Sequence, residues 1–238
     1  MVKRPNAILG KRTPQHPSQL NEALRLDTFR GIRARMKAQD VISTYELVGR
    51  EWAKQRNIKL FERQWLDRML TAAPHAQGKQ RILDLGCGSG KPIATYLAER
   101  GALMTGVDAT QTMTALYAQS LPNADVIKAD MRGLKLDRQF DAIIAWDSFF
   151  HLSAEDQRPM FATFAAHAAP RAALMFTSGH SAGEVIGQVA GAPIYHASLA
   201  PDEYRALLAE AGFKVLRHTT EDPTCSGHTI WLALYQSD

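Results

Sequence analysis

The sequence has few cysteines, no long apolar run and no metal-binding spacing of histidine or cysteine. Cys87 and Cys225 are its only cysteines, too few for a disulfide framework, which favours a reducing compartment. No apolar run approaches the roughly 18 residues that a membrane span needs, and we expect no signal peptide. Neither H-x-x-x-H nor C-x-x-C occurs, which argues weakly against a metal site. We therefore expect a cytoplasmic, globular protein with no metal and no membrane partner.

The positive charge of the chain is concentrated at one end. The net charge is +4 in total, but residues 1–37 hold nine Lys and Arg against two acids, so the rest of the chain carries −3. Proteins that bind nucleic acid present a basic surface, so an acidic body disfavours nucleic acid as a partner. We expect a basic extension over residues 1–40, partly disordered or helical, and one folded domain over residues 41–238. The sequence leaves the oligomeric state open, as monomer or homodimer.

Residues 81–108 organise the domain. A short apolar run ending at Leu85 reads as a buried parallel strand, and the loop Gly86-Cys87-Gly88-Ser89-Gly90 follows it. Three glycines in five residues allow a tight turn and leave the backbone open to a ligand. Residues 91–100 predict a helix, and residues 103–107 predict a second strand that ends in Asp108. In such a unit a ligand lies over the loop, and the acid binds ribose hydroxyls.

The motif D-L-G-C-G-S-G, followed by G-V-D, resembles motif I of the class I S-adenosylmethionine-dependent methyltransferases of the small-molecule type. The spacing is G-x-G-x-G rather than the dinucleotide fingerprint G-x-G-x-x-G. Asp84, two residues before the first glycine, would repel a pyrophosphate and suits an ammonium or sulfonium ligand. An NAD-binding Rossmann unit remains the alternative. The resemblance extends from about Tyr45 to the C-terminus.

The residue pattern itself predicts an α/β doubly wound sheet. The resemblance implies more: a Rossmann-like sheet of seven strands, the last one antiparallel, and N-terminal helices that form a lid over S-adenosyl-L-methionine, whose product is S-adenosyl-L-homocysteine. By the same resemblance, the expected cofactor-binding residues are Tyr45, Asp84, Gly86, Cys87, Gly88, Ser89, Gly90, Asp108, Ala109, Asp130, Met131 and Trp146.

The sequence outside the glycine-rich unit predicts further helices, strands and one long loop. Ser43 and Glu46 fit a capping box at the start of a helix over residues 43–54. Pro159 disfavours an unbroken helix, so we expect the next main helix to start there. The glycine-rich insertion over residues 178–200 predicts a long loop that covers a substrate. Strands are expected at residues 126–127, 140–145 and 172–177, helices at 58–70, 110–120 and 201–211, and a closing hairpin at 213–219 and 228–235.

The residues after the fourth strand carry the candidate chemistry. They lie beside the first loop at the switch point of an open parallel sheet, where ligands bind. His151 is the candidate base, because neutral imidazole accepts a proton near pH 7. Asp147 is a second candidate, as a base or as an anchor for an amine. The expected substrate-binding residues are Phe149, Tyr195, His196 and His228.

The sequence favours methyl transfer to an oxygen or nitrogen of a small molecule. Trp146-Asp147-Ser148-Phe149 replaces the [DN]-P-P-[YF] motif that is typical of enzymes acting on amide or adenine nitrogen. Two alternatives stay open. One is an RNA or protein methyltransferase that uses the basic extension, and the other is a noncatalytic protein that binds S-adenosylmethionine.

Overall fold

We describe a computed structural model of the chain that covers residues 36–74 and 78–236. From Lys37 onward the described residues form one compact unit. The expected basic extension lies almost wholly outside the described residues. No described helix is both long and apolar enough to cross a bilayer.

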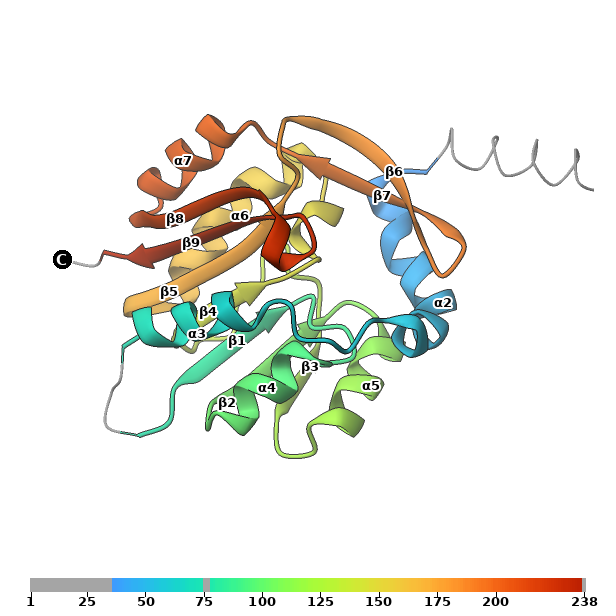
Figure 1. Cartoon of the computed structure of the whole chain (residues 1–238), viewed down its shortest axis with the longest axis horizontal. Helices are drawn as coiled ribbons and strands as arrows, with labels where there is room; N and C mark the ends of the chain where they lie inside the picture. Colours follow the sequence, from blue (N-terminus) through green and yellow to red (C-terminus); the bar gives the residue numbers. More distant parts are fainter. Residues whose placement is uncertain (1–35, 75–77, 237–238) are drawn as a thin grey trace, which may run out of the picture. The chain divides into compact units, whose positions relative to one another are not determined.

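A seven-stranded sheet forms the centre of the domain, in the order β3-β2-β1-β4-β5-β9-β8 (Figure 1). The first five strands pair in parallel, and β9 runs antiparallel between β5 and β8. The seven-stranded, doubly wound α/β sheet expected for a class I methyltransferase is therefore confirmed. The strands are β1 (Arg81–Leu85), β2 (Leu103–Asp108), β3 (Asp125–Lys128), β4 (Phe140–Ala145), β5 (Ala168–Ser178), β8 (Phe213–Asp222) and β9 (His228–Tyr235).

Helices cover both faces of the sheet because residues of the central strands are apolar on both sides. In β1, Leu83 and Leu85 belong to one core and Ile82 to the other, as the alternation of a strand requires. The first core holds residues of α6 (Ala154–His167) and α7 (Pro201–Glu210), and the second holds residues of α3 (Arg63–Ala72), α4 (Ile93–Glu99) and α5 (Gln111–Ser120).

The lid begins with a short 3-10 helix, η1 (Ala38–Asp40), which leads into α2 (Val41–Gln55). The expected capping box is wrong: α2 has no side-chain cap, and the Ser43 hydroxyl donates to the carbonyl of Asp40. Glu46 instead accepts from the backbone N–H of Gln111 at 2.8 Å and from the Thr112 hydroxyl at 2.9 Å. An acid of the lid therefore lies at the positive N-terminus of α5, which an acid stabilises.

Two further expectations are corrected. The insertion after β5 is an antiparallel hairpin of β6 (Gly183–Val189) and β7 (Ala192–Ser198), in which Ile186 pairs with Tyr195. It lies along the lid, since β7 contacts both η1 and α2. Helix α6 starts at Ala154 with Ser153 as its N-cap and runs through Pro159 without a break. Packing of α6 against the sheet outweighs the one backbone hydrogen bond that a proline removes.

Candidate functional site

A ligand pocket lies at the carboxyl ends of β1, β2 and β4, with the lid helix α2 across it. The glycine-rich loop forms its floor. Gly86, Gly88 and Gly90 all have positive φ, at 67°, 54° and 75°. A Cβ on Gly86 would overlap Cβ of Ser148, and one on Gly90 would lie 2.7 Å from a methyl of Leu121. Glycine is required here because the backbone is left-handed and its neighbours pack against it.

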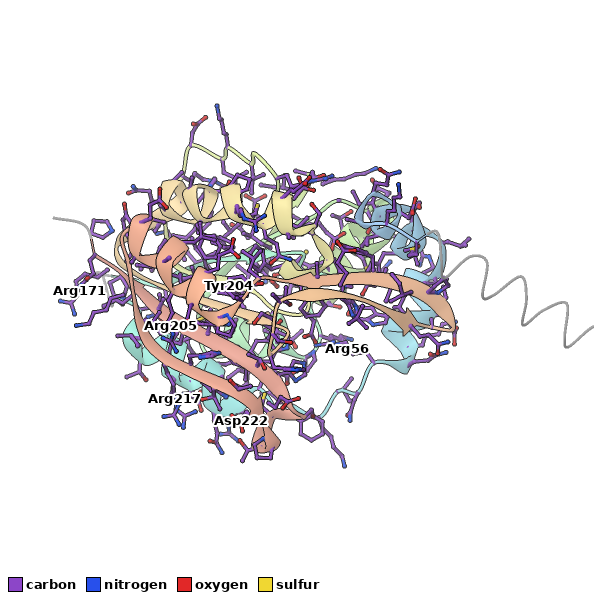
Figure 2. The ribbon with its side chains drawn as sticks, turned by 90° about the horizontal axis from the view of Figure 1, so that it is seen from above. Arg56, Arg171, Tyr204, Arg205, Arg217 and Asp222 are labelled. Atoms are coloured by element: carbon purple, nitrogen blue, oxygen red, sulfur yellow. The ribbon has the colours of Figure 1, made fainter. Side chains whose placement is uncertain are left out.

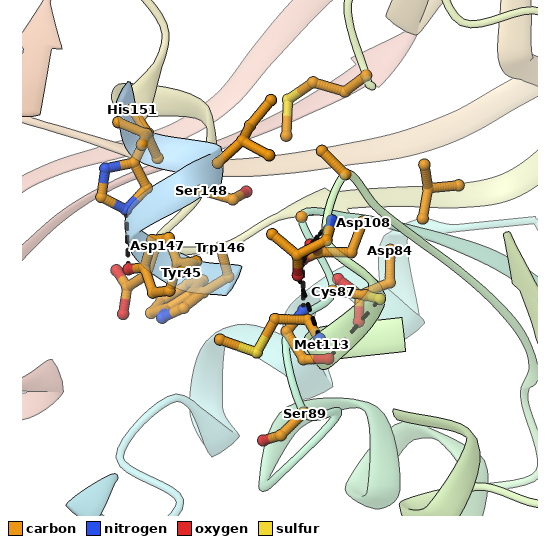
Figure 3. A pocket seen from close by; sticks show the side chains of 18 of the residues that line it. Tyr45, Asp84, Cys87, Ser89, Asp108, Met113, Trp146, Asp147, Ser148 and His151 are labelled. Atoms are coloured by element: carbon orange, nitrogen blue, oxygen red, sulfur yellow. Dashed lines mark hydrogen bonds between the residues drawn. The ribbon is translucent and has the colours of Figure 1, made fainter. Parts of the chain in front are cut away.

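Asp108 at the end of β2 ties the loop to the start of α5. Its carboxylate accepts from the backbone N–H of Gly88 at 3.1 Å and from that of Thr110 at 2.9 Å. Burial raises the pKa of Asp108, and these hydrogen bonds oppose that rise. The side chain lines the pocket beside Ala109 (Figure 3). An anchored carboxylate at this edge is suited to accept hydrogen bonds from a pair of hydroxyls.

Asp84 is a buried carboxylate in the same wall, 6% exposed. Burial, and then the nearby charge of Asp108, raise the pKa of Asp84 to about 7. Because a further negative charge is unfavourable beside these two acids, this part of the pocket favours a cationic ligand and disfavours a phosphate.

The segment after β4 forms the opposite wall. Trp146 is buried, and Asp147 has a left-handed backbone, with φ of 49°. The carboxylate of Asp147 lies 3.0 Å from Nε2 of His228 and 3.7 Å from the guanidinium of Arg56. Burial alone would raise the pKa of Asp147, but the hydrogen bond with His228 and the charge of Arg56 hold it below its ordinary value. Asp147 is therefore an ion-paired carboxylate, which makes it a poor proton acceptor at neutral pH.

His151 is fixed by hydrogen bonds at both ring nitrogens. Nδ1 lies 2.9 Å from the backbone carbonyl of Tyr195, and Nε2 lies 3.1 Å from the hydroxyl of Tyr45. A carbonyl only accepts, so Nδ1 carries the proton and the Nε2 lone pair faces Tyr45. Burial lowers the pKa of His151 to about 4, so the ring is neutral at physiological pH.

The structure brings together most of the predicted site. All the residues expected to contact the cofactor line the pocket, as do the candidate catalytic residues His151 and Asp147. In Figure 3, Tyr45 and His151 lie on one side of the pocket, and Asp84 and Asp108 lie on the other.

The expected substrate residues are placed differently. Phe149 is fully buried among Phe161, Phe164 and Phe176, so the structure corrects its expected place in the pocket. Tyr195 contributes its carbonyl to His151. His196 lies behind His151, with ring centroids 4.8 Å apart.

Several lining residues were not expected from the motifs. Ile42 and Val41 come from the start of the lid, Met113 from the first turn of α5, and Arg132 from the loop after β3. Met113 is held by the N-cap Thr110, whose hydroxyl accepts from the backbone N–H of Met113. Arg132 bonds Asp130 at 2.6 Å, so this acid, which was expected to contact the cofactor, is ion-paired.

The strand order and the glycine-rich loop match the architecture that the resemblance to class I methyltransferases implies. Comparisons with known proteins also point to methyltransferases. Residues 82–171 match a family model described as a methyltransferase domain. The chain is 32% identical over 114 residues to a protein of Geobacillus sp. (strain WCH70) and 34% identical over 105 residues to YqeM of Bacillus subtilis (strain 168). Both carry provisional methyltransferase names. The matches cover 39% and 38% of this chain but only 45% and 42% of the relatives.

Solved structures share the fold. CalS10 of Micromonospora echinaspora, an amino pentose methyltransferase with bound S-adenosylmethionine, superposes with a TM-score of 0.61 at 20% identity, over 81% of this chain and 97% of that chain. Magnesium protoporphyrin IX methyltransferase of Synechocystis PCC 6803 with bound S-adenosylhomocysteine gives a TM-score of 0.64 at 19% identity, over 84% and 99% of the two chains. These likenesses confirm the predicted fold, and the family model confirms the predicted resemblance to a methyltransferase domain over residues 82–171.

Proposed function

We propose that this protein is an S-adenosylmethionine-dependent methyltransferase that acts on an oxygen or nitrogen of a small molecule. The observation that carries the proposal is the pairing of the open glycine-rich loop with the two buried acids Asp84 and Asp108 in one pocket. S-adenosylmethionine supplies an activated methyl group on a sulfonium. The residues present fit it: a phosphate-rich dinucleotide would meet two carboxylates, whereas a sulfonium and an ammonium meet favourable charge.

Each part of the pocket would hold one part of the cofactor. Asp108 would accept from the ribose hydroxyls, and Asp130 with Met131 would border the adenine. Asp84 would neutralise the cationic amino acid end. The guanidinium of Arg56 would bind the carboxylate of that end, since its Nε already bonds the carbonyl of Lys91 beside the glycine-rich loop.

The acceptor would meet His151 and Tyr45. As the acceptor oxygen or nitrogen bonds to the methyl carbon, the carbon–sulfur bond would break, S-adenosylhomocysteine would leave, and the acceptor would have to lose its proton. The Tyr45 hydroxyl would take that proton while passing its own to Nε2 of His151; the hydrogen bond of 3.1 Å between the two atoms supports this path. Burial raises the pKa of Tyr45 well above its usual range, so Tyr45 transfers protons without becoming a stable phenolate.

The lid helix and the hairpin favour a small molecule as the methyl acceptor. Helix α2 lines the pocket and hairpin β6–β7 packs along this helix, whereas large polymers need an open pocket. The body of the chain is net acidic, which favours neutral or cationic molecules. The structural relatives named above act on an amino pentose and a magnesium porphyrin, and both are small molecules.

Calorimetry with S-adenosylhomocysteine and with NAD tests the proposal. We expect binding of the first and none of the second. Tight NAD binding without a response to S-adenosylhomocysteine would refute the assignment. A screen of hydroxyl and amine metabolites, with release of S-adenosylhomocysteine as the signal, then identifies the acceptor and excludes a noncatalytic binding protein.

A further inference from the structure

Both ring nitrogens of His228, the first residue of β9, meet hydrogen-bond acceptors. Nδ1 lies 2.7 Å from the backbone carbonyl of Cys225, and Nε2 lies 3.0 Å from Oδ1 of Asp147. A carbonyl oxygen never donates, and an ionised carboxylate cannot. Both contacts are hydrogen bonds only if both nitrogens carry protons, so the geometry indicates an imidazolium.

The surroundings keep the negative charge on Asp147. The other carboxylate oxygen, Oδ2, faces the guanidinium of Arg56 at 3.7 Å, and the backbone N–H of Asp147 donates to the Thr177 hydroxyl at 2.9 Å. Two positive groups therefore flank one carboxylate, and a proton on Asp147 would lose both attractions. Arg56 also lies 3.7 Å from a second acid, Glu62. Burial raises the pKa of Glu62.

The chain holds His228 rigidly from several elements. The preceding turn is capped by Asp222, which accepts from the backbone N–H of Thr224 at 2.9 Å and from the indole N–H of Trp65 at 2.8 Å. Figure 2 shows Asp222 at the end of the β8–β9 hairpin. The imidazole also packs on Trp146, with ring centroids 5.3 Å apart. The β8–β9 turn and the segment after β4 therefore contact this histidine directly, and helix α3 supports the turn through Trp65.

The ion pair has a consequence for the proton acceptor of the site. Asp147 and His151 both line the pocket, and Figure 3 shows them on the same side of it. There the charge of Asp147 favours the protonated form of His151, against the burial that lowers the pKa of that ring. During turnover His151 gains a proton, so a fixed anion nearby stabilises the state that forms. A neutral Asp147, or one turned away from the pocket, would remove this stabilisation.

We propose that His228 is a positioning residue for methyl transfer: as an imidazolium it holds Asp147 ionised and oriented, so that the imidazolium formed at His151 has a fixed counter-charge. This inference rests on the proposed function. It assigns Asp147 the role of a fixed anion rather than a base, and it gives His228 a role in the reaction without contact with the acceptor.

Nitrogen-15 NMR of the histidine rings tests the protonation state without any substrate. The His228 signals are assigned by their loss in His228→Gln. We expect both ring nitrogens to be protonated at pH 7.5 in the wild type, with a pKa above the ordinary 6.5 or so. Asp147→Asn should lower that pKa by about one unit or more, because it removes the negative partner. A wild-type ring with one bare nitrogen at pH 7 overturns the proposal.

Kinetics test the role of His228 once an acceptor is known. His228→Gln should lower kcat by about 100-fold, the loss typical of a misplaced group, while the affinity for S-adenosylhomocysteine stays within about twofold. His228→Lys, which keeps a positive donor, should recover part of kcat. The matched control is His180→Gln, because that histidine is 61% exposed and outside the pocket. Unchanged kcat in His228→Gln with intact cofactor binding overturns this inference alone, whereas a wild type that binds no S-adenosylhomocysteine overturns the proposed function.

Discussion

The hydroxyl of Tyr45 lies 3.1 Å from Nε2 of His151, and the two rings meet edge to face with centroids 5.4 Å apart. One residue belongs to the lid helix and the other follows β4, 106 positions further along the chain. The carbonyl of Tyr195, from the hairpin β6–β7, fixes the tautomer of the same imidazole at 2.9 Å. The lid helix, the segment after β4 and the hairpin β6–β7 therefore together fix the His151 ring and the lone pair on its Nε2. The arrangement is complete only when the lid helix lies over the pocket.

We expect His151→Ala to lower kcat by about 100- to 10,000-fold, the usual contribution of a general base. Tyr45→Phe should also lower kcat, because it breaks the path for the proton. Neither change should weaken S-adenosylhomocysteine binding more than a few-fold, since the glycine-rich loop and Asp108 are untouched. Steady-state kinetics with the identified acceptor and calorimetry measure the two effects separately. Near-normal turnover of His151→Ala would show that His151 is not the base and only lines the pocket.

The pH profile gives a second measurement on the same pair. Burial lowers the pKa of His151 to about 4, so the ring stays able to accept a proton down to about that pH. The acid limb that belongs to His151 should therefore lie near pH 4, rather than at the pH of about 6.5 typical of an exposed histidine. An acid limb near pH 6.5 that disappears in His151→Gln would contradict the burial of this ring in the working enzyme.

Much of the fold and of the cofactor site could be predicted because its signals are local. The motif over residues 84–90 and the acid at Asp108 belong to a single strand–loop–helix–strand unit, and the predicted strand over residues 140–145 coincides with β4. Glycine spacing and strand-end acids do not depend on distant contacts. The glycine φ values of 67°, 54° and 75° show why only this residue type fits the loop.

The remaining errors concern residues whose role is set by distant partners. Phe149 packs among aromatic residues of α6 and β5, and nothing near it in the sequence distinguishes that core from a pocket wall. Glu46 lies three residues after Ser43, which satisfies the capping-box pattern, but it reaches α5 instead. The hairpin β6–β7 is rich in glycine, and its pairing along the lid outweighs that composition.

Asp108→Ala should weaken S-adenosylhomocysteine binding strongly. Hydrogen bonds to a charged group are worth about 1.5–3 kcal/mol each, so losing one or two ribose contacts corresponds to roughly 10-fold or more in Kd. Calorimetry measures the change. The control is Asp125→Ala, which removes an exposed acid that pairs with Arg138 at the other end of the sheet. Equal losses in both variants would show a general effect of charge rather than a ribose contact.

Removal of residues 1–18 should leave kcat nearly unchanged. These residues precede the region that resembles methyltransferases, and they hold few apolar anchors. The truncated and full-length proteins are compared in the same kinetic assay and by RNA binding at two salt concentrations. A large loss of kcat would show that the extension completes the site. Steeply salt-dependent RNA binding by the full-length protein alone would favour the nucleic-acid alternative.

Glu46→Ala should speed the release of S-adenosylhomocysteine. Glu46 is the lid residue that bonds the N-terminus of α5, through Gln111 and Thr112. Losing a helix cap costs about 0.5–2 kcal/mol, so the dissociation rate should rise by about 2- to 30-fold if the lid opens before release. Stopped-flow fluorescence measures this rate. Glu51→Ala on the same helix is the control, because Glu51 pairs only with exposed groups nearby. Equal rates in wild type and Glu46→Ala would show that the lid does not limit release.

Binding of S-adenosylmethionine should release a proton from Asp84. Burial and Asp108 raise the pKa of the Asp84 carboxyl to about 7, so below pH 7 much of it is protonated in the free protein. A cationic ligand favours the ionised form and lowers that pKa. Affinity should therefore rise by up to about tenfold per pH unit as the pH increases toward 7, and should level off above it.

Calorimetry between pH 5.5 and 8, in buffers of different ionisation enthalpy, counts the released protons directly. Asp84→Asn should abolish the release and flatten the pH dependence, because an amide does not titrate. Adenosine, which lacks the sulfonium and the ammonium, should bind without proton release to the wild type. A wild type that binds S-adenosylmethionine with no proton release at pH 6 would show that Asp84 is already ionised, and that another group neutralises the cationic end of the cofactor.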